Sequence, residues 1–519
     1  MPPTDLPALS PLELHGRDLT VAQVVAVARD GRPVEVSAEA CDRMEASRGV
    51  IARAVAEGRT VYGVTTGFGD LADVRIDPRQ TAQLQRNLVR SHAAGVGEPL
   101  PTDVVRAMLL LRAATLAVGY SGTRPEVAEL LCAMLNARVH PVIPSRGSVG
   151  ASGDLAPLAH LALVVIGEGE AEVDGRRMRG DEALAAAGLE PLVLEAKEGL
   201  ALLNGTQLMA AIGCLGLHDA RLLARTADVA GGMSLEAMEG TADAFAAALV
   251  EARPHPGQVA VAAHLRELLA ESEICAHHHD SAHRVQDAYS LRCMPQVHGA
   301  IHDALDQLGR VLTIEINSAT DNPVVLPPSD GVPGGQVISG GNFHGEPLAL
   351  VLDYVKTGVV ELASISERRT ARLVDAHLSG GLPAFLSERA GMGSGLMIAQ
   401  YTAASLVNEL QVLAHPASVD TIPTSANQED HVSMGATSAL HLHVALDRAQ
   451  TVLAIETLCA AQGLDFRAPL RPGKGLARAH DLVRGSVPHL DEDRPPAPDI
   501  GTVRELIASG ALLAVADGE

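Results

Sequence analysis

The sequence predicts a mainly α-helical protein, in which a bundle of long helices follows an N-terminal domain of mixed structure. Three observations lead to this fold class. Apolar residues make up 47% of the 519 residues, but only 2% are aromatic and none is Trp, so Leu, Val and Ala must fill the core, which suits closely packed helices. Apolar side chains recur at helical spacing over long stretches after Asn204. Candidate strands are few and short.

The first third of the chain alternates helices with loops. Thr20 is a suitable cap for a first helix, which Gly31-Arg32-Pro33 ends. Ser37 is a suitable cap for a second helix that reaches about Gly58, and glycines then interrupt the pattern over residues 59–70. Helical spacing predicts further helices over residues 80–94, 102–118, 297–317, 347–376, 397–413, 435–462 and 503–513. Short strands are expected over residues 171–173, 324–326 and 337–338.

A change in pattern suggests where the domains divide. The long helical stretches begin just after Asn204, so we expect an N-terminal domain over residues 1–210, bearing the reactive group described below, and a helical bundle domain over residues 211–519. Pro and charged residues become more frequent from Arg467 onward, so the C-terminal helices are expected to be peripheral.

Charge and cysteine usage exclude several classes of partner. The formal net charge of −23 argues against binding to nucleic acids or anionic membranes, since Lys and Arg form no dense tract. The six cysteines are scattered without a C-x-x-C pair, which fits reduced thiols in the cytoplasm better than disulfides or a zinc site. Residues 1–14 lack the features of a signal peptide, and no apolar run approaches the roughly 20 residues of a membrane span. We therefore expect a cytoplasmic protein without a metal.

A fourteen-residue string carries the strongest chemical signal. Residues 147–160 read Gly-Ser-Val-Gly-Ala-Ser-Gly-Asp-Leu-Ala-Pro-Leu-Ala-His, and the Ala151-Ser152-Gly153 triplet within them can become an electrophile. If the glycine nitrogen attacks the alanine carbonyl carbon, a five-membered ring closes, and loss of water, including the serine hydroxyl, leaves an exocyclic methylene. The product is a methylidene-imidazolone. Taken alone, the triplet also fits an ordinary turn, with Asp154 as the cap of the next helix.

Other chemistries have weaker support. A serine hydrolase is disfavoured because residues 150–154 do not follow the G-x-S-x-G pattern that exposes a nucleophilic serine, and His160 lies on the same predicted helix without a visible third partner. His277-His278-His279-Asp280 is expected to be a polar loop, because adjacent histidines cannot all bind one metal ion without distortion. Gly473-Lys474-Gly475 lacks the spacing of a phosphate-binding loop, so no nucleotide is expected.

The fourteen-residue string closely resembles the signature of the aromatic amino acid ammonia-lyase family. Further strings similar to those of the family follow in the same order from about Val61 to Leu464. The resemblance implies a helical fold of the fumarase/aspartase-like superfamily and a methylidene-imidazolone (MIO) formed autocatalytically from the catalytic residues Ala151, Ser152 and Gly153. It also implies an amino acid substrate, no metal or nucleotide cofactor, and a homotetramer whose active sites combine residues from three subunits.

The resemblance assigns roles to individual side chains. Tyr62, in Tyr-Gly-Val-Thr-Thr-Gly-Phe-Gly, takes the position of the base that removes the substrate β-proton. Arg292 takes the position that binds the substrate carboxylate, a task suited to a bidentate guanidinium. Asn204 is similar to the asparagine beside the prosthetic ring. The substrate pocket is expected to include Gln286, Tyr289 and Phe343, of which Tyr289 also counts as catalytic.

Two positions indicate which amino acid the site accepts. Ser91-His92 resembles the histidine-specific members of the family, in which a histidine faces the substrate imidazole. Glu429 also follows those members, which carry a carboxylate where phenylalanine and tyrosine enzymes typically have a glutamine. A carboxylate beside an imidazole favours the cationic form of the ring. Thr65 departs from the pattern, because many histidine enzymes have Asn or Ser there.

The resemblance therefore implies elimination of ammonia from L-histidine to give urocanate, with Glu429 acting in catalysis as well as in binding. A tyrosine or phenylalanine ammonia-lyase, or a 2,3-aminomutase, is the alternative within the family. A helical scaffold without activity is the alternative from another class, and it would keep Ser152 unmodified.

Overall fold

The chain divides into two units, each made of three stretches. The computed structural model describes residues 10–61, 63–66, 80–278, 286–329, 331–389 and 391–518. The first unit consists of Met1–His218, Leu308–Leu352 and Ala417–Leu440, and the second unit of Asp219–Gln307, Asp353–Pro416 and His441–Glu519. The expected domains, residues 1–210 and 211–519, stay a prediction.

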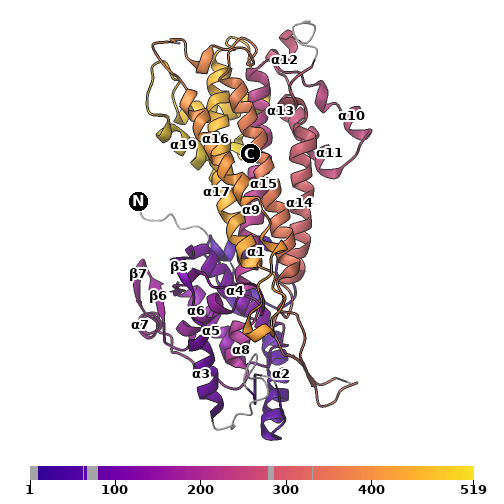
Figure 1. Cartoon of the computed structure of the whole chain (residues 1–519), viewed down its shortest axis with the longest axis vertical. Coiled ribbons are helices and arrows are strands. Elements are labelled where there is room, and N and C mark those ends of the chain that lie inside the picture. Colours follow the sequence, from indigo (N-terminus) through magenta and orange to yellow (C-terminus); the bar gives the residue numbers. More distant parts are fainter. Residues whose placement is uncertain are drawn as a thin grey trace. The chain divides into compact units, whose positions relative to one another are not determined.

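Short helices and small sheets make up much of the first unit (Figure 1). Its helices are α1 (Val21–Ala28), α2 (Ala38–Ala56), α3 (Thr81–His92), α4 (Thr102–Ala117), α5 (Pro125–Asn136), α6 (Leu155–Val165), α7 (Gly180–Ala186) and α8 (Glu198–Leu203). Its strands are β1 (Leu12–Leu14), β2 (Val34–Val36), β3 (Val96–Pro99), β4 (His140–Pro141), β5 (Pro144–Arg146), β6 (Glu170–Val173), β7 (Arg176–Arg179), β8 (Val324–Leu326) and β9 (Gln336–Ile338).

Local sequence explains where the first helices begin. The Thr20 hydroxyl accepts a hydrogen bond from the Gln23 N–H, and the Gln23 side chain accepts one from the Thr20 N–H, so α1 begins with a capping box. The Ser37 hydroxyl accepts from the Ala40 N–H at the start of α2. Both predicted caps are confirmed. α4 is buried along nearly its whole length, where it packs against α1, α2 and α5.

The strands of the described residues form four small sheets. β1 and β2 are parallel, with Leu12 opposite Val34. The other pairings are antiparallel, and they join β3 to β5, β4 to β6, β6 to β7, and β8 to β9. The sequence predicts β6, β8 and β9 but misses the remaining strands of the described residues. All of these strands have only two to four residues, which is too short for a clear alternating pattern.

Five long helices of the described residues run along one another in Figure 1, and four of them belong partly to each unit. They are α9 (Gln207–Ala237), α14 (Met294–Glu315), α15 (Glu346–Leu373), α16 (Met397–Leu413) and α17 (Gly435–Asp465). The shorter helices are α10 (Ala247–Glu251), α11 (Pro256–Leu268), α12 (Glu273–His278), α13 (Tyr289–Arg292), α18 (Lys474–Ser486), α19 (Pro496–Ala508) and α20 (Ala511–Asp517).

Buried contacts of acidic side chains join these long helices. Asp228 on α9 lies 2.7 Å from the Nδ1 atom of His298 on α14. The Arg369 guanidinium on α15 donates to both carboxylate oxygens of Glu456 on α17, and both side chains are fully buried. Buried charges are tolerated in a core when they are paired in this way.

The C-terminal helix prediction is wrong in one place. The sequence predicts one helix over residues 503–513, but α19 ends at Ala508 and α20 begins at Ala511. Gly510 separates them with a left-handed φ of 77°, a conformation that ends helices. Among the residues that the structure describes, no helix combines the length and apolar composition that crossing a membrane requires.

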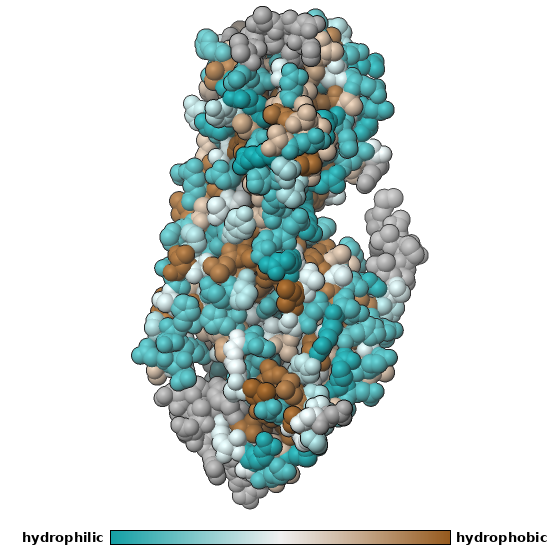
Figure 2. Space-filling model, turned by 90° about the vertical axis from the view of Figure 1, so that its right-hand side faces the viewer, coloured by the Kyte–Doolittle hydropathy of each residue, from teal (hydrophilic) through white to brown (hydrophobic). Residues whose placement is uncertain are grey.

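Several large apolar side chains are exposed on the surface of the chain. On the face that Figure 2 presents, apolar residues gather in patches between hydrophilic ones. Helix α16, for example, exposes the side chains of Ile398, Tyr401 and Val412.

Candidate active site

The loop that carries the triplet requires glycine at two positions. Gly150 and Gly153 adopt left-handed φ values of 65° and 75°. A Cβ on Gly150 would come within 2.2 Å of the Ser433 hydroxyl, and one on Gly153 within 2.1 Å of the Gly205 carbonyl oxygen. Any larger residue would therefore push the loop away from its neighbours.

The triplet contacts two of the predicted site residues. The Asn204 side-chain amide donates to the Ser152 carbonyl oxygen at 2.8 Å. The Ser152 hydroxyl donates to Glu429 Oε1 at 2.9 Å, and the Thr424 hydroxyl donates to the other oxygen of the same carboxylate at 2.7 Å. The structure thus brings together Asn204, Glu429 and Ser152, which are far apart in the sequence.

Four helices begin at this loop. Leu155 starts α6 directly after it, and the Asp154 carboxylate accepts from the N–H groups of Leu208 and Met209 in the first turn of α9. The residues just before α15 and α17 also donate to the loop, from Gly345 N to the Gly150 oxygen and from Met434 N to the Val149 oxygen. The N-terminal end of a helix carries partial positive charge, so these four ends favour negative charge developing at the loop.

Asp154 does not cap its own helix, contrary to the prediction from the turn alone. Its side chain makes no capping bond to α6 and binds the start of α9 instead, while the Ser148 hydroxyl donates to its other oxygen at 2.8 Å. Burial raises the pKa of Asp154 to about 6, although these hydrogen bonds act in the opposite direction. Nothing in the local sequence reveals this contact, because α9 begins some fifty residues later.

His92 is the last residue of α3, and the negative charge of Glu429 acts on its ring. Its Nδ1 atom lies 2.9 Å from the Leu88 carbonyl oxygen, which can only accept, so Nδ1 carries the proton and Nε2 is left as an acceptor. Burial lowers the pKa of His92, while the bond to Leu88 and the negative charge of Glu429 act to raise it. His92 and Glu429, the two residues expected to select the substrate, therefore interact electrostatically.

The remaining predicted residues fall into three groups. Tyr289 and Arg292 lie on α13 in the second unit, where the guanidinium carbon is 4.7 Å from the centre of the tyrosine ring. Arg292 Nε is buried without a hydrogen-bond partner, and Gln286 in the same unit is exposed. Phe343 is half-buried, two residues before the Gly345 that contacts the loop. Tyr62 lies outside the described residues.

Thr65 is occupied within its own turn. Its hydroxyl accepts from the Val61 N–H at 2.9 Å and donates to the Arg59 carbonyl oxygen at 2.7 Å. The residue that departs from the histidine pattern thus binds the backbone at residues 59 and 61.

A comparison with protein families identifies the family to which the chain belongs. Residues 19–485 match the family described as aromatic amino acid lyase. The chain belongs to the aromatic amino acid lyase family.

Relatives within the family are similar over nearly the whole chain. A histidine ammonia-lyase of Deinococcus radiodurans is 56% identical over 500 residues, which cover 96% of this chain and 94% of the relative. Another of Sorangium cellulosum is 55% identical, with coverages of 97% and 98%. Among solved structures, the histidine ammonia-lyase of Trypanosoma cruzi superposes with a TM-score of 0.90 at 44% identity, covering 98% of this chain and 95% of that one. The tyrosine aminomutase of Streptomyces globisporus has a TM-score of 0.91 at 38% identity, with coverages of 97% and 98%.

Two other features of this aromatic amino acid lyase lie apart from the triplet. Within the described ranges, no three His, Cys, Asp or Glu side chains form a group that could hold a metal ion. In the predicted polar loop, His277 belongs to α12, whereas His279 and Asp280 lie outside the described residues.

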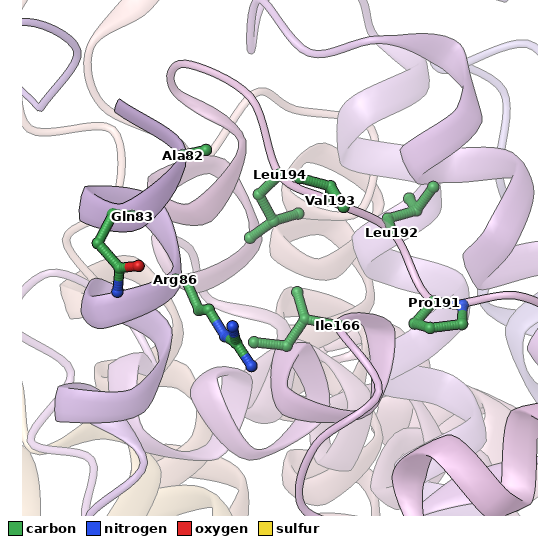
Figure 3. Close-up of a pocket in the computed structure, with 8 residues that line it drawn as sticks. All are labelled: Ala82, Gln83, Arg86, Ile166, Pro191, Leu192, Val193 and Leu194. Atoms are coloured by element: carbon green, nitrogen blue, oxygen red, sulfur yellow. The ribbon is translucent and has the colours of Figure 1, made fainter. Parts of the chain in front are cut away.

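A pocket of about 400 Å³ contains none of the predicted site residues, and Figure 3 shows Arg86 reaching from α3 toward Ile166. The pocket is lined by Ala82, Gln83, Arg86, Ile166, Pro191, Leu192, Val193 and Leu194.

Proposed function

We propose that this family member is a carbon–nitrogen lyase that eliminates ammonia from L-histidine to give trans-urocanate, a step of histidine degradation. The observation that carries the proposal is the position of Glu429, whose carboxylate binds the Ser152 hydroxyl and whose charge acts on His92. A carboxylate beside the triplet, and a histidine on which its charge acts, suit a substrate with an imidazole ring. Relatives named histidine ammonia-lyase, at 52–56% identity, support the same substrate.

The residues around the triplet fit the MIO group that the family implies. Gly150 and Gly153 allow the tight turn, and the Asn204 Oδ1 atom is buried without a partner beside the triplet. Ala151, Ser152 and Gly153 would form the group, Asn204 would hold it through the Ser152 carbonyl oxygen, and Glu429 would lie beside the carbon that loses the serine hydroxyl. When formed, the group supplies an electrophile that draws electrons from the substrate and so eases the loss of its amine.

The chain's own side chains would bind the substrate and move its protons. His92 Nε2 is free to accept a hydrogen bond from the substrate imidazole, and Glu429 favours the positive charge of that ring. Arg292, whose buried Nε lacks a partner, would bind the carboxylate, with Gln286, Tyr289 and Phe343 around the ligand. Tyr62 would remove the β-proton.

The second candidate is a lyase or 2,3-aminomutase acting on tyrosine or phenylalanine. The high TM-score with a tyrosine aminomutase favours it, since that enzyme has the same fold at 38% identity. Histidine is preferred because Glu429 and His92 interact, and because the relatives named histidine ammonia-lyase are more similar in sequence.

Assembly and location belong to the same proposal. A homotetramer with shared active sites is supported by exposed rings such as Tyr289, 72% exposed on α13, and Tyr401, 61% exposed on α16. A cytoplasmic location is supported by the six cysteines, all of which are free thiols.

Ultraviolet absorbance tests the proposal directly, since urocanate, coumarate and cinnamate absorb differently. The purified protein is incubated separately with L-histidine, L-tyrosine and L-phenylalanine. We expect urocanate from histidine and at least tenfold lower turnover of the other two. Turnover of tyrosine without turnover of histidine would favour the second candidate, and no turnover of any of them would favour the inactive scaffold.

A further inference from the structure

We propose that Arg112 is a positioning residue for formation of the prosthetic group, because it fixes the backbone segment that holds the triplet. The inference rests on the proposed function only in so far as the triplet cyclises. Arg112 itself does not touch the triplet in the structure and acts through Asn204.

The Arg112 guanidinium is buried where a charge is costly. It lies on α4 and is fully buried, and its burial lowers its pKa to about 10, opposed by the charges of Asp321 and Asp154. It therefore stays positively charged at neutral pH. A cation deep in a core destabilises the fold unless it is well bonded, so its contacts indicate what it does.

Those contacts lead directly to the triplet. Arg112 Nη1 donates to the carbonyl oxygens of Ala201 at 2.7 Å and Asn204 at 2.9 Å, at the C-terminal end of α8, where a cation also suits the helix dipole. The side chain of the same Asn204 donates to the Ser152 carbonyl oxygen. One guanidinium thus fixes the backbone from which the Ser152 contact is made.

Gly205, the residue after Asn204, fixes the backbone on the C-terminal side of the triplet. The Gly205 carbonyl oxygen accepts from the Asp154 N–H at 2.7 Å, and Gly205 pairs with Gly153 as an isolated parallel bridge. A Cβ on Gly205 would come within 2.5 Å of Arg112 Nη2, so the guanidinium lies against this glycine. Residues 204 and 205 therefore fix the backbone on both sides of Gly153, and Arg112 lies behind them.

Arg112 also has unused donors. Its Nε and Nη2 atoms are buried without hydrogen-bond partners, and the nearby Gln207 Oε1 is likewise unpaired. A buried guanidinium that leaves three N–H groups without partners carries a large desolvation cost. Its presence is explained if it is needed for the chemistry of the segment that it holds.

Cyclisation depends on this positioning because two backbone atoms must meet. A bond forms between the Gly153 nitrogen and the Ala151 carbonyl carbon. The Ala151 oxygen leaves as water with the hydrogens of the Gly153 and Ser152 nitrogens, and the Ser152 hydroxyl leaves as a second water with the hydrogen of its own Cα. The balance requires no oxidant. Small displacements of reacting atoms slow such intramolecular steps strongly.

The experiment compares two arginines of α4 in the full-length protein. Arg106 is also buried and also donates to carbonyl oxygens, those of Val27, Ala28 and Leu135, but not to residues 201–204. Intact mass gives the fraction of chains that have lost two waters, about 36 Da, as a readout independent of activity. We expect Arg112→Gln to lower this fraction at least tenfold at equal time after synthesis, and Arg106→Gln to leave it near that of the wild type.

A conservative variant covers the case in which Arg112→Gln does not fold. Arg112→Lys keeps the charge but cannot reproduce the paired carbonyl contacts, so it should fold and dehydrate more slowly than the wild type. Dehydration at the wild-type rate in either Arg112 variant would overturn the inference, as would equal losses in the Arg106 and Arg112 glutamine variants. An unshifted mass in the wild-type chain would overturn the proposed function and this inference together.

Discussion

The Glu429 carboxylate has neighbours with different roles. One oxygen accepts from the Ser152 hydroxyl of the triplet and the other from Thr424, while its charge raises the pKa of His92 against the larger effect of burial. The same side chain thus links the triplet, which we propose to become the electrophile, to the residue expected to face the substrate. Replacing the Glu429 carboxylate by an amide of the same shape should therefore alter the choice of substrate.

We predict that Glu429→Gln shifts specificity away from histidine. An amide keeps one acceptor but removes the charge that favours a cationic imidazole, so kcat/KM for histidine should fall at least tenfold, equivalent to about 1.4 kcal/mol. The ratio of phenylalanine or tyrosine turnover to histidine turnover should rise. Steady-state kinetics with the three amino acids measure this, with the exposed neighbour changed as Asp430→Asn for control. An unchanged ratio would contradict the role given to Glu429.

At the scale of elements, the reactive loop lies where α6, α9, α15 and α17 begin. The long helices are predictable because apolar spacing repeats over many turns, and the site residues of the first unit because they lie in distinctive strings. The contacts among them are not predictable in this way. Asp154 binds a helix that starts far along the chain, and Arg112 lies in a helix whose local pattern is simply apolar, so both depend on tertiary packing.

Glycine substitutions separate the turn geometry from the close packing of the loop. Gly153 and Gly175 have nearly equal φ values of 75° and 74°, but only Gly153 would place a Cβ against another backbone. Gly175→Ala should cost about 1–2 kcal/mol, the penalty of a left-handed alanine, and leave dehydration intact. Gly153→Ala should cost more and abolish dehydration. Thermal melts and intact mass measure both effects, and a dehydrated Gly153→Ala chain would refute the packing argument.

At the scale of the whole molecule, charges are buried mainly as pairs. Lys197 and Asp321 form a fully buried ion pair in the first unit, as Arg369 and Glu456 do in the second. His140 is different, because it accepts from the Arg106 guanidinium and must stay neutral to do so. Burial, followed by the charges of Arg106 and Arg138, lowers its pKa to about 4.

Acid should therefore destabilise the fold through His140. Because its pKa in the folded chain lies below the ordinary value of 6.5, the unfolded chain binds the proton more tightly between these values. This part of the stability is complete above pH 6.5 and is lost as the pH falls toward 4, with a slope of at most about 1.4 kcal/mol per pH unit. His140→Gln should flatten the slope in denaturant titrations at several pH values, with the exposed His377→Gln as control. Equal slopes for the wild type and His140→Gln would rule this out.

Self-association should depend on the exposed ring of Tyr401. Light scattering of the wild type should give four times the chain mass of 53.9 kDa. Tyr401→Glu places a charge on an exposed apolar face of α16, so it should yield smaller species with little activity, whereas Tyr401→Phe should remain assembled. A fully assembled and active Tyr401→Glu protein would show that this face is not part of the interface.

The central claim is that Ala151, Ser152 and Gly153 become an electrophile, and intact mass tests it most directly. The purified wild-type chain should weigh about 36 Da less than its sequence, because two waters are lost, and the deficit should map to the peptide that contains the triplet. Ser152→Ala should lack the serine-derived part of the deficit and most of the activity while staying folded. A wild-type chain of unshifted mass would contradict the account.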